Sequence, residues 1–186
     1  MATIFSVADD EIQGRLRQVL GRHHPLLVKY DVAVLAIGAE NYKTDALTSG
    51  GFPCTATARV VPDRDHCTKR HQAEITIDLM RWATLTPSQK DALLDHELCH
   101  IDLDYDDDSG KPKRDSLRRV RVKLRKADFQ PSDGFLEVIE RHGKDAPEWR
   151  SLSHVGTLAG EALARRPTLF DTVPPDEASE ATEGDE

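Results

Sequence analysis

The sequence is poor in cysteine and in aromatic residues, and it has no long apolar segment. Its 186 residues contain three cysteines, Cys54, Cys67 and Cys99, without a Cys-x-x-Cys pair, so a disulfide framework is not expected. No apolar run approaches the ~20 residues that a membrane-spanning helix needs. The first residues lack the basic and apolar regions of a signal peptide. These absences argue against a membrane protein and an exported protein, and they predict a protein of the reducing cytoplasm.

Charge is distributed unevenly along the chain, although the net charge is only −8. The last sixteen residues, 171–186, carry seven acidic residues and no basic one, whereas Lys111–Lys126 holds nine basic residues against one aspartate. We therefore predict one domain over residues 1–166 and an acidic, disordered tail over 167–186. The basic segment has the charge density to contact nucleic acid, but it has no aromatic residue for stacking on bases. A solvated strand face is the favoured interpretation.

The order of apolar patterns predicts an α+β fold. Helical spacing indicates helices near Ser6–Gly21, Thr86–Ile101, Phe135–His142 and Leu152–Arg165, and apolar or alternating runs indicate strands at Val32–Ala39, Thr55–Val61 and Ala73–Leu79. In the last of these strands, apolar residues alternate with Glu74, Thr76 and Asp78, which is typical of a half-buried strand. We expect the edge of this strand to hold an extended peptide.

The helix that starts near Thr86 is the best specified element. Thr86 and Gln89 form a Thr-x-x-Gln capping box, and Pro87 occupies the first helical position. Leu94, Leu98 and Ile101 then form an apolar stripe that faces the core.

This helix carries the motif His96-Glu97-Leu98-Cys99-His100, an H-E-x-x-H sequence. Histidines four residues apart lie one turn apart on the same helix face, so both imidazoles can reach one metal ion. Glu97 lies beside them, where a general base can accept a proton from a metal-activated water. The motif predicts zinc ligands at His96 and His100 and a catalytic Glu97. We expect the flanking Asp95, Asp102 and Asp104 on a solvated helix edge; the alternative is that one of them orients a ligand imidazole.

A catalytic zinc site needs a third protein ligand. The extended metzincin pattern is not present, because Leu103 stands where that pattern has glycine. A ligand from a later segment is more plausible, and the candidates are Asp128, Asp133, Glu137 and His142.

The segments DALLDHELCHIDLD (Asp91–Asp104) and RKADFQPSDGFLEVIERHG (Arg125–Gly143) resemble the metallopeptidases encoded by tailed phages and prophages, which are related to SprT-like and ImmA/IrrE-like zincins. This resemblance implies a minimal zincin-like domain, with a small, mostly antiparallel sheet packed on the motif helix and flanking helices. Members have Lys-His-Asp where this chain has Lys126-Ala127-Asp128, so the expected histidine is replaced by alanine. Asp128 is then the first candidate for the third ligand, ahead of Asp133 and Glu137.

The predicted function is a zinc-dependent metallopeptidase of phage or prophage origin in the host bacterial cytoplasm. Its substrate is expected to be a host or phage protein or peptide. The alternative is a non-catalytic module with a zincin fold that binds a host protein or, through Lys111–Lys126, nucleic acid. The missing histidine at position 127 motivates this alternative.

Overall fold

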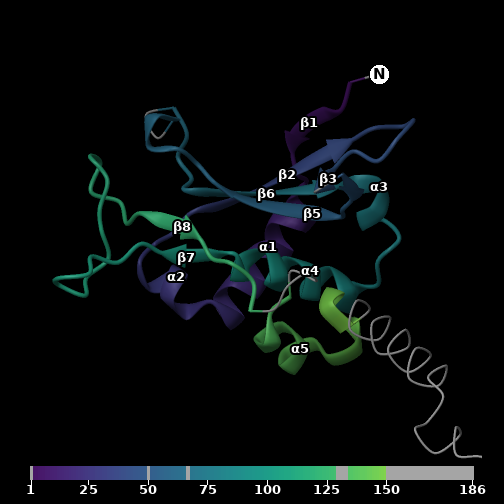
Figure 1. The fold of residues 1–186 in the computed structure, drawn as a ribbon. Coiled ribbons are helices and arrows are strands. Elements are labelled where there is room, and N and C mark those ends of the chain that lie inside the picture. Colours follow the sequence, from purple (N-terminus) through teal and green to yellow (C-terminus); the bar gives the residue numbers. More distant parts are fainter. Residues whose placement is uncertain (1, 50, 66–67, 129–133, 150–186) are drawn as a thin grey trace, which may run out of the picture. The chain divides into compact units, whose positions relative to one another are not determined.

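Two helices pack against a small four-stranded sheet (Figure 1). The structure is a computed structural model that describes residues 2–49, 51–65, 68–128 and 134–149. All of them belong to one compact unit, Met1–Ser151. The predicted helix at 152–165, the acidic tail and Asp133 lie outside the described residues. Among the described residues, no helix is long and apolar enough to cross a membrane.

The unit contains short helices and strands in mixed order, which confirms the α+β class. The helices are α1 (Asp10–His23), α2 (Pro25–Lys29), α3 (Leu79–Trp82), α4 (Pro87–Cys99) and α5 (Leu136–His142), with single 3-10 turns η1 (Asp63–Asp65) and η2 (Gly143–Asp145). The strands are β1 (Ile4–Val7), β2 (Val34–Glu40), β3 (Thr48–Ser49), β4 (Phe52–Pro53), β5 (Ala56–Val60), β6 (Ala73–Asp78), β7 (Ile101–Leu103) and β8 (Val122–Leu124).

The main sheet has the strand order β1-β2-β6-β5. Strands β1 and β2 are antiparallel, β2 and β6 are parallel, and β5 and β6 are antiparallel, so the sheet is mostly antiparallel as expected. Two small hairpins, β3-β4 and β7-β8, lie outside it. The described edges of the main sheet are therefore β1 and β5.

The predictions of a half-buried strand with a free edge at Ala73–Leu79 are wrong. β6 is paired on both sides, and Glu74 and Asp78 are each only 1% exposed. The alternating pattern predicted solvent exposure for Glu74 and Asp78, but both side chains are buried because each has specific hydrogen-bond partners. Asp78 caps α3 by accepting hydrogen bonds from the Met80 and Arg81 amides. A buried polar group is tolerated when it is hydrogen-bonded in this way.

Glu74 is held by three basic side chains. Its carboxylate accepts hydrogen bonds from Lys69 (Nζ to Oε1, 2.6 Å), His71 (Nε2 to Oε1, 2.7 Å) and Arg59. Burial alone would raise the pKa of Glu74, but these hydrogen bonds lower it from 4.5 to about 2. The ionised carboxylate is therefore the form that the folded protein stabilises.

This shift predicts a specific loss of stability in acid. Because the pKa of Glu74 is lower in the folded state, its contribution is fully present above about pH 4.5 and is lost as the pH falls towards 2. At pH 6 we expect the free energy of unfolding of the parent protein to exceed that of the Glu74→Gln variant by on the order of 2 kcal/mol. At pH 3 this difference should be smaller. Urea unfolding of both proteins measures it. A difference that stays constant between these pH values would contradict the assignment.

The N-terminal helix begins later than the sequence suggested. Residues Ile4–Val7 form β1, and Ser6 pairs with Gly38 of β2 instead of capping a helix. Asp9 is the N-cap, and its Oδ1 accepts a hydrogen bond from the Ile12 amide at 2.9 Å. Backbone pairing with β2 thus prevails over the helical pattern in the first residues.

The core lies between α1, α4 and the sheet. Its buried side chains include Leu16 of α1, Ile75 and Ile77 of β6, and Leu94 and Leu98 of α4. A smaller cluster joins Cys99 of α4 to Phe135, Val138 and Ala146. Both clusters include residues of α4, the helix that carries the H-E-x-x-H motif.

Candidate metal centre

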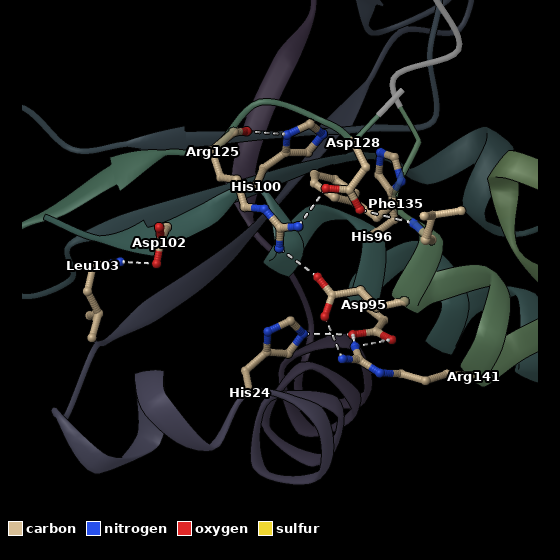
Figure 2. Close-up of polar contacts among 12 residues, drawn as sticks. His24, Asp95, His96, His100, Asp102, Leu103, Arg125, Asp128, Phe135 and Arg141 are labelled. Atoms are coloured by element: carbon tan, nitrogen blue, oxygen red, sulfur yellow. Dashed lines mark hydrogen bonds and ion pairs between the residues drawn. The ribbon is translucent and has the colours of Figure 1, made fainter. Parts of the chain in front are cut away.

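The two histidines of the motif lie side by side at the C-terminal end of α4 (Figure 2). The capping box of Thr86 and Gln89 is confirmed at the start of the helix, whereas the helix ends at Cys99 and His100 is its C-cap residue. The ring centroids of His96 and His100 are 5.0 Å apart. Phe135 packs edge-on against both rings, with centroid distances of 5.4 and 4.8 Å. The pair is therefore held in a defined arrangement.

Each imidazole is also oriented by a hydrogen bond at Nδ1. His96 Nδ1 lies 2.7 Å from Oε1 of Glu148, and His100 Nδ1 lies 3.2 Å from the backbone oxygen of Arg125. Histidines that bind a metal through Nε2 commonly donate the other ring N–H to a carboxylate or a carbonyl. Both motif histidines have the partner that this arrangement requires.

Glu148 is a candidate site residue that the sequence analysis missed. It is 1% exposed, and its Oε1 also accepts a hydrogen bond from the Phe135 amide at 3.2 Å. Its Oε2 is buried without a hydrogen-bond partner among the described residues, and within that part of the chain the carboxylate pairs with His96 and with no lysine or arginine. A buried carboxylate is costly unless positive charge compensates it. A cation held by His96 would supply that charge, so the residues fit a metal.

We expect Glu148 to strengthen metal binding through His96. Glu148→Ala is predicted to weaken zinc affinity about 10–100-fold, as loss of such an outer carboxylate usually does. Glu148→Gln keeps an oxygen acceptor and should lose less. Competition with a chromophoric chelator measures the affinity, and Glu140→Ala on the exposed side of α5 is the matched control. Equal affinity in Glu148→Ala and Glu140→Ala would contradict this role.

Glu97 lies on the same helix between the two histidines and is 4% exposed. Burial raises the pKa of the Cys54 thiol, and the negative charge of Glu97 acts in the same direction. Strand β5, which follows Cys54 in the chain, contacts α4.

Asp128, the first candidate for the third ligand, follows β8 and lies next to Arg125. Its Oδ1 accepts a hydrogen bond from Nη2 of Arg125 at 2.7 Å, and its Oδ2 accepts one from the Leu136 amide at 3.2 Å (Figure 2). The same arginine offers its backbone oxygen to His100 and packs over the Phe135 ring, with Cζ 5.0 Å from the centroid. Arg125 thus links Asp128 to His100.

The remaining candidates lie in other surroundings. Glu137 is bound by Arg125 (Oε1, 2.6 Å) and by Arg141 (Oε2, 2.8 Å). His142 has its Nε2 2.9 Å from Oδ2 of Asp95, on another side of α4. Asp133 lies outside the described residues. These contacts do not test the third ligand, so Asp128 stays a prediction, ahead of Asp133 and Glu137.

Asp95 is not on a solvated helix edge as expected, because it is fully buried at 0% exposure. Its carboxylate is hydrogen-bonded to His24, His142 and Arg141. Burial alone would raise the pKa of Asp95, but the bonds to His24 and Arg141 outweigh it and lower the pKa to about 2. Among the described residues, two groups of three side chains have possible metal-ligand atoms within 4.8 Å of one another, and both contain Asp95. They are His23–Asp95–His142 and His24–Asp95–Cys99. Arg141 already compensates this carboxylate, so we assign the cluster to the packing of α1, α4 and α5.

Comparison with known protein families places the chain in one family. The family model described as "Putative phage metallopeptidase" matches residues 6–158. The chain therefore belongs to the phage metallopeptidase family, which implies a metal-dependent peptidase. No curated protein and no solved structure matches the chain.

Proposed function

We propose that this protein is a zinc-dependent peptidase with a zincin-like fold, in which His96 and His100 bind zinc and Glu97 is the general base. One observation carries the proposal: both motif histidines are fixed through Nδ1, by Glu148 and by the Arg125 carbonyl, beside a buried glutamate. Hydrogen bonds of this kind are common for histidines that bind a metal through Nε2, and they support the proposal. Membership in the phage metallopeptidase family supports the same reaction class.

In this proposal Asp128 completes the donor set. Two imidazoles and one carboxylate are a ligand set that catalytic zinc sites use. The carboxylate is tied to the same local structure as His100, since Arg125 contacts both. To bind a metal, Asp128 would exchange part of its contact with Arg125, and Glu137 would retain that arginine through its own 2.6 Å ion pair.

In peptide hydrolysis, each residue of the site would have a separate role. Bound zinc would supply a Lewis acid that polarises the peptide carbonyl and makes water more acidic. The Glu97 carboxylate accepts the proton of the attacking water and then delivers it to the amine that leaves. Phe135 packs on both imidazoles, and Glu148 and the Arg125 carbonyl keep the rings in one orientation. This positioning limits the reorganisation that the reaction requires.

The proposed substrate is a host or phage protein in the bacterial cytoplasm, bound as an extended strand. Because β6 is paired on both sides, the proposal moves the extended peptide from β6 to β5. β5 is an edge strand of the main sheet, and it contacts α4, the helix that carries Glu97. An extended peptide can add to such an edge through backbone hydrogen bonds.

A peptide pool tests the proposal. The purified full chain is loaded with zinc, incubated with peptides from a tryptic digest of a bacterial proteome, and new termini are identified by mass spectrometry. We expect new cleavage sites with the zinc-loaded protein, their loss after chelation and their return after zinc is restored. Absence of new termini under all three conditions would contradict peptidase activity.

A further inference from the structure

A small pocket adjoins the metal-binding face of α4. It has a volume of about 70 Å³. Its lining residues come from three parts of the chain. Thr55 lies just before β5, Leu85 lies in the turn before α4, and Gln89 and Leu93 belong to α4. Asp145 and Pro147 follow α5.

Helix geometry places this pocket beside the motif. Gln89, Leu93, His96 and His100 follow one another at intervals of four, three and four residues, so they lie along one face of α4. Leu93 precedes Glu97 by one helical turn, a rise of roughly 6 Å along the axis. The pocket therefore lies on the side of the histidines that faces the start of the helix.

The other two walls of the pocket are also linked to α4 by residues that lie next to them in the chain. Pro147 directly precedes Glu148, whose carboxylate bonds His96. Thr55 directly precedes β5, which contacts α4. The pocket is thus lined by the helix that carries the motif and by the residue that precedes Glu148, so a peptide bound at the proposed metal centre would extend towards it.

We propose that this pocket receives one side chain of the substrate, next to the bond that is cleaved, and selects compact aliphatic residues such as valine, alanine and leucine. The inference rests on the proposed peptidase function. Leu85, Leu93 and Pro147 provide apolar walls, and the carboxylate of Asp145 disfavours an acidic side chain. The volume is under half of the ~150 Å³ of a cavity that holds benzene, so the pocket suits a small side chain better than an aromatic one.

Two substitutions change the pocket in opposite directions. Thr55→Leu adds bulk at a half-buried wall, and Leu85→Ala removes bulk at another. Leu117→Ala, a 56% exposed leucine in the β7–β8 connection, is the matched control. A change of one or two methylene groups in an apolar pocket alters discrimination between substrates by about 10–200-fold.

The test is a cleavage profile of the zinc-loaded full chain on the proteome-derived peptide pool. We expect the parent to favour Val, Ala or Leu at one position beside the cleaved bond and to avoid Phe, Trp, Asp and Glu. Thr55→Leu should reduce cleavage at Val and Leu about tenfold relative to Ala, Leu85→Ala should gain cleavage at Phe, and Leu117→Ala should match the parent.

The outcomes separate this inference from the function on which it rests. Cleavage by the parent with a profile that neither pocket variant alters would overturn the pocket assignment and leave the peptidase function standing. Absence of cleavage by the parent and by Leu117→Ala would overturn both. Circular dichroism of each variant confirms that it folds, and the opposite directions expected from Thr55→Leu and Leu85→Ala distinguish altered selectivity from a general loss of activity.

Discussion

Replacing Glu97 by glutamine is expected to lower the rate of peptide hydrolysis by about 10²–10⁴-fold, the usual contribution of a general acid–base group. Glutamine has nearly the same size as glutamate but cannot accept the proton of the attacking water. Because Glu97 is not one of the proposed ligands, the variant should still bind zinc. Rates on a peptide identified from the pool, together with zinc content, measure both expectations.

The matched control is Glu140→Gln, on the exposed side of α5, which should hydrolyse the peptide like the parent. A Glu97→Gln protein that retains zinc and hydrolyses the peptide at the parent rate would refute the assigned base. Loss of both zinc and activity would instead indicate that the carboxylate supports metal binding.

Replacing Asp95 by alanine is expected to lower the free energy of unfolding by about 3–5 kcal/mol, which is typical when one partner of a buried ion pair is removed. The fully buried carboxylate accepts hydrogen bonds from His24 at 2.7 Å, from Arg141 at 2.9 Å and from His142 at 2.9 Å. These residues belong to α5 and to the end of α1. Their contacts with Asp95 therefore connect both helices to α4.

Urea unfolding of the metal-free protein measures this loss without the stabilisation that a bound metal adds. Asp91→Ala is the matched control, because Asp91 lies one turn earlier on α4 and pairs with Arg15 at 2.7 Å in a partly exposed position. Exposed pairs contribute at most about 1 kcal/mol. If the two variants lost the same stability, Asp95 would not hold the helices together.

The sequence predicted the parts of the fold that depend on local chemistry. The capping box of Thr86 and Gln89 sets the start of α4, and Gly143 ends α5 with a positive φ of 55°. Both signals act within a few residues, so they can be recognised in the sequence alone. The same holds for His96 and His100, whose spacing alone places them on one helix face.

Features that depend on distant partners were missed. Glu74 in β6 and Asp95 in α4 are charged residues in positions that pattern alone assigns to solvent, yet both are buried with basic partners that come from other segments. Glu148 lies 52 positions after His96 in the sequence, and no spacing rule connects the two residues. β1 formed because β2 offered a pairing edge to residues whose own preference was ambiguous.

Metal content tests the central claim most directly. The parent chain, His96→Ala and Asp128→Ala are purified after zinc supplementation and measured by elemental mass spectrometry. The account predicts about one zinc per chain in the parent and its loss in both variants, as for a site with three protein ligands. Zinc lost only from His96→Ala would move the third ligand to Asp133, Glu137 or His142. A parent that binds no zinc would contradict the metal site and favour the non-catalytic alternative.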